Sequence, residues 1–549
     1  MNVAQIIVKS LERYGVKRIY GIIGTSIVDS LDAVRESKLR YISTRHEQVA
    51  VSMADAEGRI TGQPGIAYVH GGPGFLNSLI SVANAYKDSS PLLMVAGAVK
   101  RRLTGLDGWL EVPQREMIRP IVKGAYRIDR PTEAARIISE AYSLAASDPK
   151  GPAFIEVPED VWTLESGQQI VQPTVQHAPT PNPDQVAKAA DLLKRSKKPL
   201  LVVGGGLNEP RGAQFLTKVV EKFGIPVVST GNGRGTLPED HVLSLGRVGF
   251  GGGSLAADSA LDESDLVIAV GAGVSDVTTY GYNLTPKGEI VVADLDPLWE
   301  AKPVPYTLHL KCDSASFLES LAEQDLNYTP DRSWLHFIDE KREVWKVLLN
   351  DAIKREYADY VNPSRFLDAL NTKMPRNTLI TAGQGLHILY VYDFLKIKAQ
   401  GSFIAATNLG AMGFALPAAL AAKLAQPERE VIAIIGDGEF LMTMHDLETA
   451  VREKVGAKVV IVNDNSYRVL YMRQKIQKMG RIIGTLHTNP NTLKIAEAFG
   501  INGMVVRSDS EIDGAVDFIL ERADTPRLLE LRISPDDLPP LNMEATQKF

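Results

Sequence analysis

The sequence predicts an α/β protein that consists of three doubly wound, parallel-sheet domains. Apolar runs of four to seven residues alternate with helical patterns along almost the whole chain, which is typical of parallel α/β layers. The length of 549 residues is too great for a single hydrophobic core. With 44% hydrophobic and 23% charged residues, the composition is that of an ordinary globular protein. No short repeat occurs, but three α/β units of similar size follow one another.

The first domain is predicted over residues 1–165. Residues 1–24 place apolar side chains at helical spacing and then form a short apolar run, which predicts a helix and a strand rather than a signal peptide. Further strands are predicted at 65–69, 91–97 and 153–158. Residues 165–185 are rich in Pro, Gln and Thr without periodicity, so they are predicted to be a linker.

The second domain is predicted over residues 186–325 and the third over 360–535. The apolar runs of the second domain predict strands at 199–206, 225–230, 265–272 and 289–297. Those of the third domain predict strands at 377–383, 431–438, 458–465 and 527–533. A charged stretch with tryptophans, about 326–360, is expected to connect the two domains.

The bulk properties exclude several classes of function. A net charge of −6 and a pI near 5.9 give no electrostatic footprint for nucleic acid. No apolar run approaches the roughly 18–20 residues of a membrane helix, so no membrane contact is expected. Cys312 is the single cysteine, which excludes an internal disulfide, and a catalytic thiol there has no support from the neighbouring residues. A cytoplasmic location is expected.

Polar clusters follow two neighbouring strands of the third domain. Asp437 lies between two glycines, Gly436 and Gly438, directly after one apolar run, and Asp464 follows the next run. Between them, residues 442–455 carry apolar side chains at helical spacing and predict one amphipathic helix, its apolar face formed by Met444, Leu447, Val451 and Val455. A right-handed strand–helix–strand unit brings both strand ends to the same edge of the sheet, where ligands of open α/β sheets bind.

These clusters predict a site for Mg²⁺ and a diphosphate. The glycines let the backbone approach a ligand closely, and the following helix directs N–H groups to the same place. Two carboxylates beside anion-binding amides suit a hard divalent cation that also binds phosphate oxygens. For the Gly-Asp-Gly sequence alone, the alternative is a tight turn without a ligand. No Walker-type phosphate loop occurs.

The chain resembles thiamine diphosphate enzymes of the acetohydroxyacid synthase and pyruvate decarboxylase group. The resemblance covers nearly the whole chain and rests on motifs in the family's order. These are "RHEQVAVSMADAEGRITGQPG" (45–65), "GGPGFLNSLISVANAYKDSSPLLMVAG" (71–97), "NLGAMGFALPAALAA" (408–422) and "GDG" with "ND" (436–438 and 463–464). It implies a pyrimidine-binding, a central and a diphosphate-binding domain, in that order.

The resemblance also implies roles for individual residues. Glu47 would protonate N1′ of the cofactor's pyrimidine ring, and burial near an apolar pocket would keep this acid protonated. Met412 would be the wedge that bends the cofactor, and Gly410 would offer its carbonyl to the amino group. The metal ligands would be Asp437, Asp464 and the backbone carbonyl of Ser466. The residues expected near the diphosphate or the bound cofactor are Gly436, Gly438, Glu439, His387 and Tyr467.

The chain departs from acetohydroxyacid synthases at three places. His70 stands where synthases usually carry a small hydroxyl residue, and it resembles the proton-transferring histidine of benzoylformate decarboxylases; the alternative is a histidine satisfied at a strand end. Arg473 replaces a tryptophan that shapes acceptor choice, and it would anchor the acceptor's carboxylate. Residues 270–281 lack the Arg-containing turn associated with flavin, so FAD is possible but not favoured. Lys123, in contrast, matches a substrate-channel lysine of the synthases.

The resemblance therefore implies decarboxylation of a 2-oxo acid, with pyruvate as the first candidate, followed by carboligation to a second carbonyl compound. The alternative is a 2-oxo acid decarboxylase that releases an aldehyde. A 2-hydroxyacyl-CoA lyase and a non-catalytic paralogue are further alternatives, and the first is disfavoured by the few basic residues after Ile533. The family implies a homodimer or homotetramer with active sites between subunits. A regulatory subunit is left open.

Overall fold

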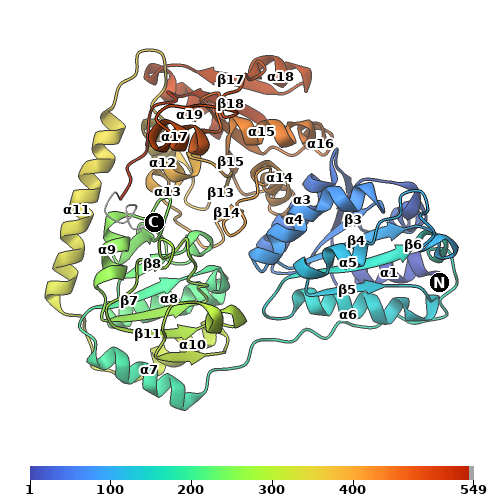
Figure 1. Ribbon diagram of the computed structural model, residues 1–549, viewed down its shortest axis with the longest axis horizontal. Helices are drawn as coiled ribbons and strands as arrows, with labels where there is room; N and C mark the ends of the chain where they lie inside the picture. The colour runs from blue at the N-terminus through green and yellow to red at the C-terminus, as the bar shows by residue number, and fades with distance from the viewer. Residues whose placement is uncertain (543–549) are drawn as a thin grey trace.

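Three six-stranded sheets, all parallel, make up the protein, and the predicted fold class is confirmed (Figure 1). The computed structural model describes residues 1–542. Each sheet lies within one of the expected domain ranges, and the precise domain limits stay a prediction. Among the described residues, no helix combines the length and the apolar character that crossing a membrane requires.

The N-terminal sheet has the strand order β2-β1-β3-β4-β6-β5. Its strands are β1 (Arg18–Gly21), β2 (Arg40–Ser43), β3 (Gly65–Val69), β4 (Leu92–Ala98), β5 (Gly124–Arg127) and β6 (Pro152–Pro158). The helices around it are α1 (Val3–Arg13), α2 (Val28–Arg35), α3 (Glu47–Thr61), α4 (Pro73–Lys87), α5 (Gln114–Ile118) and α6 (Ala134–Ala146). The chain then runs through residues 166–182 without helix or strand, which confirms most of the predicted linker, but its last three residues already belong to α7 (Pro183–Arg195).

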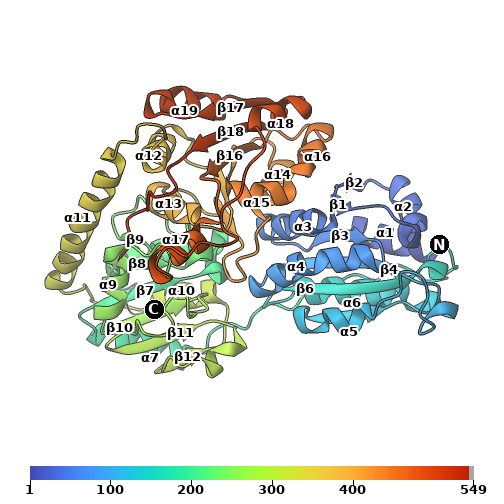
Figure 2. The same ribbon diagram turned by 45° about the horizontal axis from the view of Figure 1, so that its top comes forward.

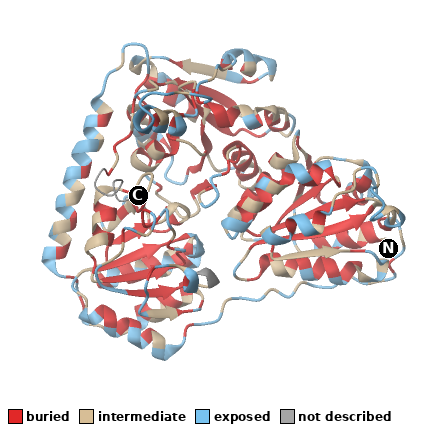
Figure 3. Ribbon diagram, viewed as in Figure 1, coloured by how far each residue is buried: buried red, intermediate tan, exposed pale blue. Residues whose placement is uncertain are grey.

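The central sheet has the order β12-β11-β10-β7-β8-β9. Its strands are β7 (Pro199–Val203), β8 (Val227–Ser229), β9 (Ser244–Arg247), β10 (Leu266–Val270), β11 (Glu289–Ala293) and β12 (Leu308–Leu310). The helices are α7 (Pro183–Arg195), α8 (Pro210–Phe223), α9 (Leu255–Glu263) and α10 (Ser314–Glu323). The charged stretch that follows forms one long helix, α11 (Arg332–Lys354), which buries Trp334, Ile338 and Trp345 and exposes most of its charges (Figure 3).

The C-terminal sheet repeats the order of the N-terminal one, β14-β13-β15-β16-β18-β17. Its strands are β13 (Leu379–Ala382), β14 (Phe403–Ala405), β15 (Val431–Gly436), β16 (Lys458–Asn463), β17 (Asn502–Val506) and β18 (Arg527–Arg532). Its helices are α12 (Pro363–Lys373), α13 (His387–Phe394), α14 (Ala415–Ala425), α15 (Asp437–Thr443), α16 (Leu447–Arg452), α17 (Arg468–Gln477), α18 (Thr492–Ala498) and α19 (Ile512–Leu520). After Ile533 the tail returns toward the central domain, where Asn542 donates to Asp258 over 2.9 Å. Lys548, the lysine of this tail, lies outside the described residues.

The twelve strands predicted from sequence are all present, and the six missed strands are the edges of the three sheets. These edge strands are β2, β5, β9, β12, β14 and β17. Most are partly exposed, whereas the inner strands are buried almost throughout (Figure 3). An inner parallel strand is covered on both faces and reads as a continuous apolar run, but an edge strand need not.

The single helix predicted over 442–455 is wrong. The chain forms α15, then a 3₁₀ turn at Met444–Asp446, then α16. The break buries Asp446, which accepts a hydrogen bond from the backbone nitrogen of Arg45 in the N-terminal domain over 2.9 Å. The apolar face itself is present, with Leu447 and Val455 buried. A tertiary contact thus interrupts a helix that local periodicity would have continued.

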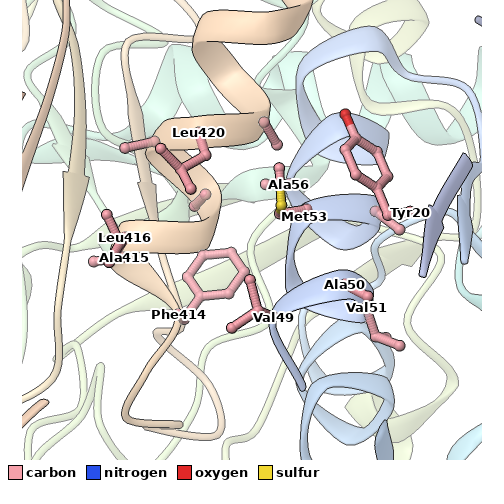
Figure 4. Packing of buried hydrophobic residues seen from close by; sticks show 14 of the residues in the cluster. Tyr20, Val49, Ala50, Val51, Met53, Ala56, Phe414, Ala415, Leu416 and Leu420 are labelled. Atoms are coloured by element: carbon pink, nitrogen blue, oxygen red, sulfur yellow. The ribbon is translucent and has the colours of Figure 1, made fainter. Parts of the chain in front are cut away.

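The N- and C-terminal domains share one hydrophobic core. Helix α3 packs on α14, and the buried cluster joins Val49 and Met53 of α3 to Phe414, Leu416 and Leu420 at α14 (Figure 4). Both ribbon views place α3 beside α14 (Figures 1 and 2). This contact holds the start of α3 next to the loop that leads into α14.

Candidate active site

The two predicted metal ligands lie at the point where the C-terminal sheet reverses its strand order. Strand order reverses between β13 and β15, which is where open α/β sheets bind ligands. Asp437 begins α15 directly after β15, and Asp464 follows the neighbouring strand β16. Asp437 is 5% exposed, the side chain of Asp464 is 6% exposed, and their charges interact. Burial raises the pKa of Asp464 to about 6; the charge of Arg468 opposes this rise, and that of Asp437 adds to it.

Two further residues of the loop before α18 complete the surroundings of Asp437. Asn489 donates from Nδ2 to the Asp437 carboxylate over 2.6 Å, and Nε2 of His487 lies 3.1 Å from the same oxygen. Asn489 also donates to the side-chain oxygens of Asn463 and Asn465, over 2.9 and 3.0 Å. Sequence reasoning missed His487 and Asn489, because only the folded loop brings them to the strand ends.

Ser466 lies beside the second carboxylate. Its hydroxyl donates to Oδ1 of Asp464 over 2.6 Å. Asn465, just before it, has a φ of 58°, in the left-handed region that asparagine tolerates better than most residues. This turn fixes the backbone of Ser466 two residues after Asp464, the position from which its carbonyl is expected to reach a metal.

Glycines allow His387 and Tyr467 to close over the Asp437 loop. A Cβ at Gly436 would lie 2.9 Å from Nδ1 of His387, and one at Gly438 would lie 2.7 Å from Cε1 of Tyr467. Burial lowers the pKa of His387 to about 4, so its ring is neutral. Among the described residues, Nε2 of His387 has no hydrogen-bond partner. The structure thus gathers four of the predicted cofactor contacts and leaves a buried ring nitrogen unsatisfied.

Glu439 connects two loops through its carboxylate, and its predicted place near the diphosphate stays a prediction. Its buried carboxylate accepts from the backbone nitrogens of Gln384 over 2.5 Å, Phe414 over 3.2 Å and Ala415 over 3.4 Å. Burial raises its pKa to about 7, and the backbone donors oppose that rise. Glu439 therefore ties the loop after β13 to the start of α14, next to the predicted wedge.

The loop that carries Gly410 and Met412 is attached to the N-terminal domain at both ends. Asn408 donates from its backbone nitrogen to Asp88 over 3.3 Å, and Gln48 donates to the carbonyl of Met412 over 3.2 Å. Gly410 has a φ of 72°, and a Cβ there would meet no atom within 4 Å. Its backbone therefore stays open to a ligand.

Glu47 and His70 face each other across a glycine. Glu47 is the first residue of α3 and accepts from Nδ2 of Asn77 over 3.0 Å. A Cβ at Gly74 would lie 3.0 Å from the Glu47 carboxylate and 3.2 Å from Cβ of His70. His70 directly follows β3 and shares a 2.7 Å hydrogen bond with Ser26. Burial lowers the pKa of His70 and outweighs the opposing charge of Glu47, so the ring is neutral at pH 7.

Three other candidates lie outside this cluster. Arg473 is exposed on α17 and donates to Gln477 over 2.9 Å, so it faces solvent in the single chain. Lys123 does not line a channel: its ammonium donates to the carbonyls of Leu144, Ser147 and Pro149 over 2.6 to 2.7 Å, which uses all three of its hydrogens. Cys312 is buried, and burial raises its pKa to about 12, so it is not an activated thiol.

The central domain has the strand order of dinucleotide-binding sheets, 3-2-1-4-5-6 when read from β9. Its glycines at the reversal point serve packing. A Cβ at Gly204 would lie 2.2 Å from the carbonyl oxygen of Gly271, and Gly206 donates to that oxygen over 2.9 Å. The two loops thus lie directly on each other. That the central domain does not bind FAD stays a prediction.

The residues present fit Mg²⁺ and a diphosphate. Asp437, Asp464 and the Ser466 backbone supply hard oxygen atoms, and His387 supplies a buried nitrogen without a partner. In the part of the chain that the structure describes, no three His, Cys, Asp or Glu side chains gather around one metal position. Such a sparse set suits Mg²⁺, which proteins bind through one or two carboxylates together with phosphate oxygens.

Three protein-family models, all of thiamine pyrophosphate enzymes, match the chain. Residues 1–119 match the N-terminal TPP binding domain, residues 186–321 the central domain and residues 383–531 the C-terminal TPP binding domain. The chain is 32% identical to a probable acetolactate synthase large subunit of Methanocaldococcus jannaschii over 98% of this chain and 93% of the relative. It is 30% identical to the acetolactate synthase large subunit of Lactococcus lactis over 97% and 93%, and 28% identical to the isozyme 3 large subunit of Escherichia coli over 97% and 94%.

The matches cover the same three α/β units that carry the strand-end carboxylates, the glycine-lined loops and Glu47. The chain therefore belongs to the thiamine pyrophosphate enzyme family, as a three-domain enzyme similar to acetolactate synthase large subunits.

Proposed function

We propose that the protein is a thiamine diphosphate- and Mg²⁺-dependent enzyme that decarboxylates a 2-oxo acid, pyruvate first, and joins the remaining unit to a second carbonyl compound. The observation that carries this proposal is the pairing of Asp437 and Asp464 at the edge of the C-terminal sheet, beside the unsatisfied ring of His387. When bound, thiamine diphosphate supplies the electron sink that lets the 2-oxo acid lose CO₂. The names of the curated relatives support the same reaction.

The chain's own residues would bind and orient the cofactor. Asp437, Asp464 and the carbonyl of Ser466 would hold Mg²⁺. Glu47 would hold a proton at N1′ of the pyrimidine, as an acid beside a ring nitrogen can. Gly410 and Met412 would orient the ring, since their loop is fixed by Gln48 and Asp88.

A decarboxylase that releases an aldehyde is the second candidate, and His70 favours it. Its neutral ring lies next to Glu47 and keeps a hydrogen bond to Ser26, so it suits proton transfer near pH 7. Arg473, the expected anchor of an acceptor carboxylate, is exposed on α17 in the single chain. It would reach an acceptor only if the complete site brings another surface onto that helix.

A homodimer or homotetramer with active sites between subunits is part of the proposal, as is a cytoplasmic location. Apolar side chains are exposed along α4, at Leu76, Ile80 and Tyr86. Others are exposed on α17, at Leu470 and Ile476. Burial of these side chains against a second copy would be favourable and would enclose both halves of the site. The relatives are named large subunits, so a regulatory subunit is also open to test.

The test is product analysis. Purified protein is incubated with pyruvate, thiamine diphosphate and Mg²⁺, and the products are followed by NMR, with an EDTA-treated sample as control. Acetolactate in excess of acetaldehyde is expected. Arg473→Ala should then shift the product toward aldehyde, because losing a charge-assisted anchor costs about 1.5–3 kcal/mol. Acetaldehyde as the main product, with a ratio that Arg473→Ala leaves unchanged, would favour the decarboxylase instead.

A further inference from the structure

Arg468 is a buried cation at the candidate cofactor site, and it is not one of the site residues predicted from the sequence. It is the first residue of α17 and is only 5% exposed. Its Nη1 lies 3.3 Å from Oδ2 of Asp464, and its Nη2 donates to the hydroxyl of Tyr390 over 3.4 Å. The α17 helix thus begins with a guanidinium against one of the two predicted metal ligands.

The hydrogen bonds of this guanidinium are incomplete. Within the described residues, its Nε and Nη1 have no hydrogen-bond partner. Asp464 compensates the charge at 3.3 Å, but the geometry of that contact leaves the N–H groups unsatisfied. A buried donor without a partner is destabilising by about 1–3 kcal/mol, and more when it is charged. Such an arrangement persists where a ligand supplies the missing acceptors.

A second buried nitrogen atom without a hydrogen-bond partner lies close by. Nε2 of His387 has no partner among the described residues either, and its ring is close enough to Arg468 for that charge to help lower its pKa. His387 packs against Gly436, immediately before Asp437. Arg468 and His387, two buried side chains beside the loops of Asp464 and Asp437, therefore have nitrogen atoms without a hydrogen-bond partner.

Once the cofactor binds, this place carries a net negative charge that a further cation would stabilise. Two carboxylates and a diphosphate together carry more negative charge than one Mg²⁺ neutralises. A guanidinium adds positive charge and matches two phosphate oxygens with a planar pair of donors. Building on the proposed function, we propose that Arg468 binds the diphosphate group of the cofactor through its Nε and Nη1 hydrogens. A substrate carboxylate offers the same chemistry, but the contact with Asp464 places Arg468 on the metal side.

The test compares ligands with and without the diphosphate. Binding of thiamine diphosphate and of thiamine to the metal-loaded protein is measured by isothermal titration calorimetry for wild type, Arg468→Met and Arg468→Lys. We expect Arg468→Met to weaken thiamine diphosphate binding about ten- to hundredfold and to leave thiamine binding unchanged. Arg468→Lys should retain part of the affinity as a point charge. The matched control is Arg522→Met, in the same domain, where the arginine is exposed and lies 3.9 Å from Glu428; it should bind like wild type.

The outcomes separate this inference from the proposed function. Wild-type binding of thiamine diphosphate together with equally tight binding by Arg468→Met would overturn the inference alone. An equal loss of affinity for thiamine and thiamine diphosphate would also overturn it, because it would indicate a purely structural role. So would unchanged cofactor binding with a raised KM for pyruvate, which would indicate that Arg468 binds the substrate carboxylate. Failure of the wild-type protein to bind thiamine diphosphate at all would overturn both. Circular dichroism and thermal melting of each variant show whether it is folded.

Discussion

Replacing Arg59 by methionine should destabilise the contact between the N- and C-terminal domains. Arg59 forms ion pairs with Asp55, over 2.8 Å, and with Asp88, over 2.9 Å, and both carboxylate side chains are 0% exposed. It also donates to the carbonyl of Ala405 over 3.1 Å and lies 4.9 Å above the ring of Phe414. Arg59→Met keeps much of the apolar stem but leaves two buried carboxylates without their cation. Breaking a buried pair in this way costs about 3–5 kcal/mol.

The assay is urea unfolding followed by tryptophan fluorescence, with the first transition analysed because a three-domain chain need not unfold in two states. The matched control is Arg136→Met, since Arg136 forms an exposed pair with Glu140 at the same helical spacing as Arg59 and Asp55. That change should cost less than about 0.5 kcal/mol. The cost of Arg59→Met should be smaller at pH 5 than at pH 8, because burial raises the pKa of Asp88 and the arginine that opposes this rise is gone. A loss below about 1 kcal/mol, or one that does not change with pH, would refute this reasoning.

The remaining predictions concern the site. Glu47→Gln should slow turnover about 10²–10⁴-fold while thiamine diphosphate still binds in calorimetry; turnover within about threefold of wild type would contradict a proton-transfer role. Asp437→Ala should lose cofactor affinity as well as rate, and equal binding with and without EDTA would argue against the metal. Burial raises the pKa of Glu439 from 4.5 to about 7, so its contribution to folding stability falls by about 3 kcal/mol as pH rises through that range; urea titrations without cofactor should show this slope in wild type and not in Glu439→Gln. Purified protein should lack a tightly bound flavin, and an absorbance band near 450 nm that leaves only on denaturation would show the opposite.

Sequence patterns were sufficient for the inner strands and insufficient for the sheet edges. Strands such as β15 and β16 are buried almost throughout and contain continuous apolar runs, Val431–Ile435 and Val459–Val462, so the pattern is clear. The residues of β5 are all half-buried, and its sequence contains a glycine and an arginine. The missed strands are therefore those in which tertiary pairing, rather than local composition, decides the conformation.

The candidate site likewise contains some residues that the sequence could predict and others that it could not. Asp437 and Asp464 could be placed because strand–helix–strand geometry fixes where their strands end. His487, Asn489 and Arg468 could not, because their position depends on how the long connection after β16 folds back. Glu439 was placed near the diphosphate from its position beside Asp437, yet its carboxylate binds backbone N–H groups of two other loops. Position along the chain locates a residue at the site but does not determine the direction of its side chain.

The core that α3 shares with α14 has a consequence for synthesis of the protein. Arg59 and Ala405, which meet in this core, are 346 positions apart. A ribosome adds roughly 5–20 residues per second, so about 17–70 s pass before the C-terminal half of the contact emerges. During that time the nascent N-terminal domain presents the apolar side of α3, with Val49 and Met53, to its surroundings. Chaperones that shield this helix during translation should therefore raise the yield of folded protein, and isolated N-terminal fragments should aggregate.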